Sequence, residues 1–409
     1  MISQREELRT LLLDCLHHDG LRVERSRLAS LSNEEWHELL ATATALGVRL
    51  LLEHRLKASG VAALLPAPVA AAWKDRDRRA VSFSLMVTGA LRRALGSLRE
   101  DGVAVIVMKG ALLAYAVYEH PALRPMGDID LLVKPSDLQR AARVLQNDGY
   151  EARAEAGDHR CHLPPFVKPG APEIDVHWRL SPPTTALPAD DLWERAVPVR
   201  VAGVEALGLC TEDLLLQVTA HASYRHYFAA GLRPFCDIAE VLWKANRPVD
   251  WAAVARRARR CEWQRGVYLC LRLARDTVGA AVPDDVLRAL EPDGFSAALI
   301  DTARFVVMQD AETNRSMTPT IVALSAATTW RARTVHVLRR VFAPRALVAM
   351  QYGLPPGSVR VLLYYPARLR YLLRRYGRVA IRLWRGDAGL HSIARRKGIL
   401  QTWLAGGPR

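Results

Sequence analysis

VAVIVMKG at residues 103–110 and RPMGDIDLLV at residues 124–133 are the two segments that decide the fold of this 409-residue chain. The first has the pattern of a buried strand that reaches a Lys-Gly turn, and a short helical segment follows it. In the second, Asp128 and Asp130 open an apolar run, and they point the same way because strand side chains alternate between faces. Their Cα atoms are expected to lie roughly 6.5–7 Å apart, a spacing at which two carboxylates can share a hard cation such as Mg²⁺.

A third acidic side chain follows in the segment EIDVHW at residues 173–178. Asp175 and His177 alternate with apolar side chains there, which predicts a strand with one polar face. If this strand neighbours the first acidic one, Asp175 completes a cluster of three carboxylates. Such a cluster can hold two metal ions for in-line displacement at phosphorus. The turn at Lys109 and Gly110, which precedes a helix, would supply backbone N–H groups for a phosphate.

The order of these features is more specific than the Asp-x-Asp pair alone, which is common at exposed strand edges. The chain resembles a bacterial family of uncharacterised nucleotidyltransferases, within the superfamily that has the DNA polymerase β-type catalytic fold. The resemblance extends from about residue 36 to about residue 283. It depends on the Lys109-Gly110 turn, Arg124 ahead of Asp-x-Asp-Leu-Leu-Val, Gly149-Tyr150 after a helix, and Asp175-Val176-His177-Trp178.

The resemblance implies an α/β (α+β) fold, with a small mixed-sheet nucleotidyltransferase core flanked by N-terminal and C-terminal helical regions. It implies Asp128, Asp130 and Asp175 as catalytic residues and metal ligands, with two Mg²⁺ ions, or Mn²⁺ in their place, as cofactors. The implied reaction moves an NMP group from an NTP to a hydroxyl or phosphate of an acceptor, which could be a small molecule, a peptide, a protein or an RNA such as tRNA. The residues expected to bind the nucleotide are Lys109, Gly110, Arg124 and His177.

Several alternatives stay open at this point. The usual turn of the superfamily is Gly-Ser or Gly-Gly, so Lys109 either pairs with a triphosphate or indicates a phosphate cradle with another use. A His…Asp-Ile pattern similar to that of the family makes His221 and Asp237 secondary candidates for the cleft. His221 could equally be a core residue, and Asp237 could cap a helix or pair with Arg233. The alternative function is a catalytically altered binding module that acts through its C-terminal region.

The composition predicts an ordered globular protein, because 50% of the residues are hydrophobic and only 24% are charged. The six cysteines contain no Cys-x-x-Cys pair, which argues against a zinc ribbon or a disulfide framework. Ser32 and Glu35 have the spacing of a capping box at the start of a helix. We expect an N-terminal helical region at 1–82, the α/β core at 83–205, a helical domain lining the cleft at 206–330, and a basic amphipathic region at 331–409.

The positive charge is concentrated at the C-terminal end. The chain has a net charge of +15, and residues 331–409 hold 17 Lys and Arg but a single acidic residue, Asp387. Residues 361–385 combine an apolar stripe with arginines that lie mostly off it. Such a segment is typical of contact with nucleic acid, an anionic membrane surface or an acidic partner, although it could also be a solvated helix docked on the same chain.

The N-terminal sequence has acidic residues where a signal peptide needs basic and then apolar ones, so we expect no export. We also expect no transmembrane segment, because no window of about 18 residues is both uncharged and apolar. The sequence therefore favours a cytoplasmic protein, with a peripheral membrane contact left open by its basic end.

Overall fold

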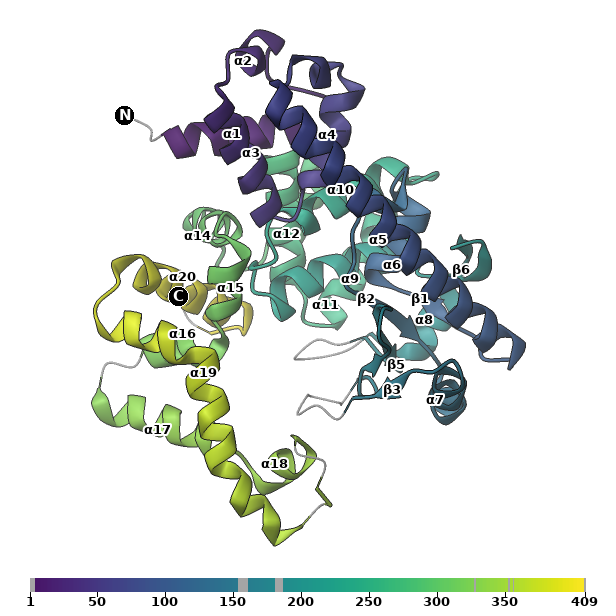
Figure 1. The fold of residues 1–409 in the computed structure, drawn as a ribbon, viewed down its shortest axis with the longest axis vertical. Helices are drawn as coiled ribbons and strands as arrows, with labels where there is room; N and C mark the ends of the chain where they lie inside the picture. Colours follow the sequence, from purple (N-terminus) through teal and green to yellow (C-terminus); the bar gives the residue numbers. More distant parts are fainter. Residues whose placement is uncertain are drawn as a thin grey trace.

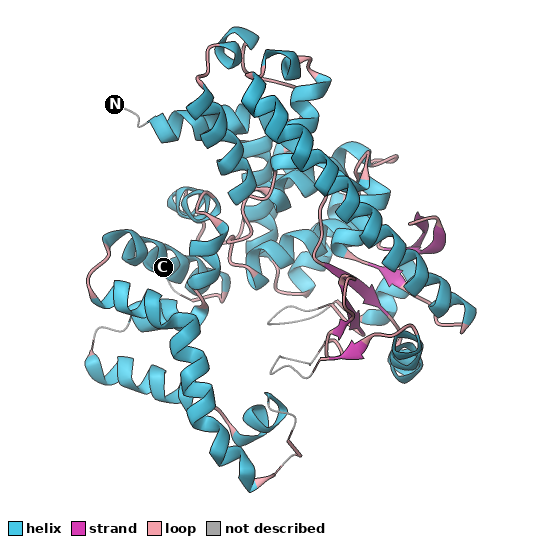
Figure 2. Ribbon diagram, viewed as in Figure 1, coloured by secondary structure: helices cyan, strands magenta, loops and turns pink. Residues whose placement is uncertain are grey.

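The computed structural model describes residues 4–153, 161–180, 187–326, 329–351, 354–355 and 357–407. One mixed sheet lies beside a larger body of helices, and the C-terminal helices form a further group at the other end of the molecule (Figure 1). Helices predominate, and the strands gather in one part of the fold (Figure 2). The predicted α/β class, a mixed sheet with helical regions before and after it in sequence, is confirmed.

The N-terminal region consists of helices around a core rich in leucine: α1 (Gln4–Leu16), α2 (Arg25–Ala29), α3 (Asn33–Ala45), α4 (Arg49–Ala58), the 3₁₀ turn η1 (Val61–Leu64) and α5 (Ala67–Glu100). The predicted capping box of α3 is present. The Glu35 N–H donates to the Ser32 hydroxyl, and the Ser32 N–H donates to the Glu35 carboxylate. The long helix α5 ends beside the sheet, where Leu91, Leu95 and Leu98 are buried at helical spacing.

A seven-stranded sheet carries both acidic segments. Its order is β3-β4-β5-β2-β1-β7-β6, with the bounds β1 (Ile106–Val107), β2 (Asp128–Leu132), β3 (Glu151–Ala152), β4 (Phe166–Val167), β5 (Glu173–His177), β6 (Val197–Val201) and β7 (Val204–Gly208). The central strand β2 is antiparallel to β1 and parallel to β5, so the predicted adjacency of the two acidic strands is confirmed. The strand expected at 103–108 contributes only two residues to the ladder, because the Val103 N–H still closes the last turn of α5 on the Leu98 carbonyl.

Short helices connect the strands: α6 (Lys109–Leu112), the π-helical turn η2 (Leu113–Val117), the 3₁₀ turns η3 (Pro121–Leu123) and η4 (Pro135–Asp137), α7 (Leu138–Asn147) and α8 (Ala189–Arg195). The helix expected after the first strand begins at Lys109, directly after Met108. Lys109 is therefore the first residue of α6 and lies at the edge where β1 ends.

A second group of helices follows the sheet in sequence: α9 (Thr211–Ala220), the π-helical turn η5 (His221–Arg225), α10 (Arg233–Lys244), α11 (Trp251–Arg260), α12 (Gln264–Val278), α13 (Asp284–Leu290), α14 (Ala298–Val307), α15 (Ala311–Ser316) and α16 (Pro319–Ala326). Helix α9 is central and contacts α10, α11 and α12. Its buried Asp213 is held by Arg195 and Arg257, at 2.9 and 2.8 Å. At Gly266 of α12 a Cβ atom would overlap Ser223 of η5, so glycine permits the close packing of η5 against α12.

The C-terminal region contains α17 (Trp330–Val341), α18 (Arg345–Gln351), the 3₁₀ segment η6 (Val359–Tyr364), α19 (Tyr365–Trp384) and α20 (Ala388–Leu404). Helix α20 packs against α14 and α16 and joins the main hydrophobic core through Leu400, Trp403 and Leu404. Two small hydrophobic clusters, separate from the main core, bury further side chains of the C-terminal helices. Within the described residues, no helix combines the length and apolar content that crossing a bilayer requires. The boundaries at 82, 205 and 330 stay predictions.

Candidate functional site

The register between β2 and β5 places the acidic side chains side by side. Asp130 lies directly opposite Asp175, and Asp128 lies opposite Glu173. Residues paired across a ladder project to the same face, and His177 follows Asp175 on that face because strand side chains alternate. The sheet thus gathers Asp130, Asp175 and His177 at one place, as the alternation in the sequence predicts.

Asp130 is the most buried of the acidic residues in this cluster, with 3% of its surface exposed. Its Oδ1 atom accepts from Lys109 Nζ at 2.5 Å and contacts His177 Nε2 at 2.9 Å. Burial alone would raise the pKa of Asp130, but the charge of Lys109 and the hydrogen bond with His177 hold that pKa well below its ordinary range. Asp130 is therefore an ionised carboxylate with one oxygen already engaged.

The neighbouring carboxyl groups behave in the opposite way. Burial, followed by the charges of Asp130 and Asp128, raises the pKa of Asp175 to about 7. Protein atoms around the more exposed Asp128 displace water from its carboxylate, and this, with the charge of Asp130, raises the pKa of Asp128 as well. The Asp175 Oδ1 atom is buried and has no hydrogen-bond partner among the described residues. The cluster thus concentrates negative charge that the protein itself does not fully neutralise.

These groups can hold a metal ion. Asp130, Asp175 and His177 each offer one ligand atom, and the three atoms lie within 4.8 Å of one another. A set rich in carboxylates suits a hard divalent cation, and the unpartnered Asp175 oxygen would gain a ligand bond in that case. The expected trio was Asp128, Asp130 and Asp175. The closest set instead contains His177, while Asp128 lines the same pocket as Asp175 and His177.

The Lys109–Gly110 turn has an unusual backbone. Lys109 has a φ of +44°, a left-handed conformation that is uncommon for a residue with a side chain. Its N–H donates to Gln217 Oε1 at 3.1 Å, which ties the turn to α9. Packing is tight at Gly110, because a Cβ there would lie 3.1 Å from Met126 Cβ. The turn therefore directs the Lys109 side chain onto Asp130 in this structure.

Arg124 forms a buried ion pair with Asp237 of α10. Arg124 Nε and Nη2 donate to the two carboxylate oxygens of Asp237 at 2.8 and 3.0 Å, and the Tyr118 hydroxyl donates to Oδ1 at 2.8 Å. Burial opposes the charge of Arg124, but Asp237 outweighs it and raises the pKa of Arg124. The alternatives for Asp237 are wrong. Asp237 lies inside α10 and so does not cap it, and both of its oxygens accept from Arg124, whereas Arg233 Nε donates to the Gly47 carbonyl. The guanidinium expected to face phosphates already has a counter-ion.

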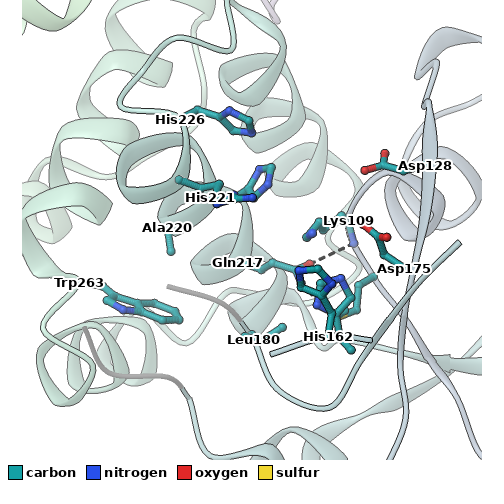
Figure 3. A pocket seen from close by; sticks show the side chains of 13 residues that line it. Lys109, Asp128, His162, Asp175, Leu180, Gln217, Ala220, His221, His226 and Trp263 are labelled. Carbon is teal, nitrogen blue, oxygen red and sulfur yellow. Dashed lines mark hydrogen bonds between the residues drawn. The ribbon is translucent and has the colours of Figure 1, made fainter. Parts of the chain in front are cut away.

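Two adjoining pockets, each of about 230 Å³, open onto this cluster. They share Lys109, Asp128, Gln217, His221 and His226. One pocket extends over the turn and is also lined by Gly110, Arg124, Gly127, Asp130, Arg233 and Asp237. The other extends past Asp175 and His177 to His162, Arg225 and Trp263. Figure 3 shows the second pocket, with Asp128 and Asp175 on one side and His221, His226 and Trp263 on the other.

The two histidines of the shared wall are neutral at physiological pH. Burial, followed by the charge of Lys109, lowers the pKa of His221 well below its ordinary value. Burial and the charge of Arg225 lower the pKa of His226 to about 4. Their rings meet edge to face with centroids 4.5 Å apart. His221 thus lines the cleft, as the resemblance implied, and does not lie in the closed core.

Sequence reasoning missed several residues of this site, namely Gln217, Arg225, His226, Trp263 and His162. Gln217 lies four residues before His221, so both fall on one face of the helical segment that spans α9 and η5. That spacing is a usable signal for Gln217. Trp263 carries no such signal, because it reaches the pocket from the start of α12.

Comparison with known proteins identifies the family of the chain. No curated protein and no solved structure matches the chain significantly. A family model described as "Uncharacterised nucleotidyltransferase" matches residues 32–279, which include the whole sheet, α9 and α10. Because this match covers more than half of the 409 residues, the chain belongs to the family of uncharacterised nucleotidyltransferases.

Proposed function

We propose that this protein transfers an NMP group from an NTP to a hydroxyl or phosphate of an acceptor in a reaction that depends on Mg²⁺. The observation that carries the proposal is the convergence of Asp130, Asp175 and His177, whose ligand atoms lie within 4.8 Å of one another in the lining of two adjoining pockets. Asp130, Asp175 and the adjacent Asp128 would hold Mg²⁺ or Mn²⁺, as one ion or two. Bound metal would neutralise charge on the phosphates and acidify the attacking hydroxyl.

Other residues of the site would bind the phosphates and take up the proton of the acceptor. Lys109, with its ammonium group beside Asp130, would neutralise negative charge that develops on the phosphates, and the backbone at Gly110 would approach them closely. Arg124 would bind phosphate on the side of the turn while Asp237 holds its guanidinium in position. Asp175, held ionised by the bound metal, would accept the proton of the acceptor hydroxyl through the oxygen that faces the acceptor.

The two pockets support a separation of the substrates. The NTP phosphates would occupy the pocket lined by Gly110 and Arg124, where the positive groups lie. The acceptor would enter the pocket that ends at Trp263, where the two neutral histidines can donate or accept hydrogen bonds. His177 lies at the junction and would orient Asp130.

The test is incubation of the purified protein with labelled NTPs, Mg²⁺ and a cell extract, followed by identification of the labelled product. Asp128→Asn should abolish labelling without lowering the melting temperature, because Asp128 lies at the exposed start of β2. The matched control is Glu151→Gln, which removes a charge from an exposed position of β3 in the same sheet. An Asp128→Asn variant that labels as fast as the control would exclude the proposal.

A second candidate is a catalytically altered binding module, favoured by one observation: Lys109 and Arg124 are already paired with Asp130 and Asp237. In that case the basic residues 331–409 would carry the function by contacting a polyanion. Thermal melting discriminates between the two candidates. Millimolar Mg-NTP should raise the melting temperature of a working transferase, and the absence of any shift would favour the binding module.

A further inference from the structure

The residues before α20 expose an unusual amount of apolar surface. We define the C-terminal arm as residues 330–384, which comprise α17, α18, η6 and α19 and extend away from the sheet (Figure 1). Most of the large apolar side chains that are exposed in the described residues belong to this arm: Val335, Val337, Leu338, Phe342, Val359, Leu362, Leu363, Leu369, Tyr371, Leu373, Ile381 and Trp384. Single exposed apolar residues are ordinary, but a concentration of this kind indicates a contact surface.

Helix α19 has two apolar sides, of which the fold uses one. Leu372 and Leu383 are buried, and Leu383 packs with side chains of α16 and α20. Leu369, Leu373 and Trp384 follow one another at intervals of about one and three helical turns, so they form a second stripe on the same side of the helix. These three are 41%, 61% and 80% exposed. The single stripe expected from the sequence is therefore split, and half of it has no cover within the described chain.

Arginines flank the exposed stripe. Arg370, Arg374 and Arg378 are exposed and form a row that begins beside Leu373 and turns toward the opposite side of α19. Residues 331–409 contain only one acidic side chain, Asp387, and it is taken up by Arg382 at 2.7 Å. Acidic groups within this part of the chain therefore cannot neutralise the other arginines, and the arm combines apolar side chains with positive charge.

We propose that the C-terminal arm binds the surface of an anionic phospholipid bilayer. The exposed apolar side chains of η6 and α19 would enter the boundary between headgroups and acyl chains, and the flanking arginines would bind the lipid phosphates. A nucleic acid would use the arginines and the aromatic rings, but it offers nothing to Val359, Leu363 and Leu373, which are 75%, 77% and 61% exposed. The aliphatic character of the surface therefore favours lipid. This inference is independent of the transferase activity.

The test is sedimentation of the full-length protein with vesicles of phosphatidylcholine alone and of phosphatidylcholine mixed with phosphatidylglycerol. We expect binding to the mixed vesicles at least about tenfold tighter than to the neutral ones. Two sets of substitutions separate the contributions of the arm: Leu363→Ser with Leu373→Ser and Trp384→Ser, and Arg370→Gln with Arg374→Gln and Arg378→Gln. Each set should weaken binding about tenfold or more, with no change in melting temperature because all six side chains are exposed.

The matched control is Trp243→Ser on α10, which removes an equally large side chain that is 65% exposed outside the arm. This variant should bind the mixed vesicles like the wild type. The proposal is overturned if the wild type fails to sediment with the mixed vesicles, or if the serine set binds as tightly as the Trp243→Ser control. It is also overturned if the protein binds RNA or DNA more tightly than lipid and the serine set leaves that binding intact.

Discussion

The raised pKa of Asp175 predicts that Asp175→Asn stabilises the metal-free protein at alkaline pH. In the unfolded chain this carboxyl ionises near its ordinary value of 3.8, whereas in the folded state its pKa is about 7. Both states are protonated at low pH, so ionisation costs the fold nothing there. As pH rises from about 4 to about 7, the unfolded state loses its proton first and gains stability relative to the native state. Above about pH 7 Asp175 is ionised in both states, and the native state bears the full free-energy cost of this buried charge.

The size of the effect follows from the shift. Each pKa unit corresponds to about 1.4 kcal/mol, so the difference sets an upper limit of roughly 4 kcal/mol. Asp175 is only partly buried, and solvent screening reduces this value to about 1–2 kcal/mol. Urea unfolding with EDTA should therefore give Asp175→Asn a larger free energy of unfolding than the wild type at about pH 8, with little difference at about pH 4.

With Mg²⁺ in place of EDTA, we expect the wild type to be more stable than Asp175→Asn, because the metal would bind the ionised Asp175 carboxylate. Mg²⁺ should stabilise the wild type more at about pH 8 than at about pH 6, and it should stabilise Asp175→Asn less than the wild type at about pH 8. Glu173→Gln is the control, since Glu173 lies on the same strand but pairs with Arg153 at the surface at 2.9 Å. The reasoning would be refuted if, without metal, Asp175→Asn were less stable than the wild type at about pH 8. It would also be refuted if the difference in free energy of unfolding between the two proteins were the same at about pH 8 and at about pH 4.

Three further predictions concern the surroundings of the cluster. Lys109→Gln removes the cation that occupies Asp130, so Mn²⁺ measured by calorimetry should bind about tenfold tighter, and equal or weaker binding would contradict this. Asp237→Asn leaves the charge of Arg124 buried without its counter-ion, so the free energy of unfolding in urea should fall by about 3–5 kcal/mol. A loss below about 1 kcal/mol would show that the pair contributes little. Ser32→Ala breaks the capping box of α3 and should cost about 1 kcal/mol, measured as a lower melting temperature.

If the proposed function and the lipid contact are both correct, the two activities lie on different parts of one chain. The transferase site lies between the sheet and α9, whereas the arm projects from the helices that follow α14 (Figure 1). An arm bound to a bilayer would hold the site near the membrane surface. Labelling of components from a membrane fraction, compared with a soluble extract, would then indicate where the acceptor is found.

The local features of the site could be predicted because the backbone imposes them directly. Alternation in DIDLL and EIDVH puts Asp130 on one face of its strand, and Asp175 and His177 on one face of theirs, since the period of a strand is two. The capping box at Ser32 and Glu35 is equally local. The neighbouring positions of the two strands were expected from the resemblance to a family, and the register confirms that expectation.

The tertiary structure alone decided which groups meet. Lys109 lies on Asp130 because the antiparallel ladder of β1 and β2 sets the end of β1 beside Asp130. Asp237 binds Arg124 across 113 positions of sequence, because α10 packs near the segments that lead into β2. No periodicity encodes such partners, so a charge that looks available for phosphate in the sequence can be neutralised in the fold. Likewise, the helical period identified the apolar residues of α19, but only the packing of its neighbours determined that Leu372 is covered and Trp384 is exposed.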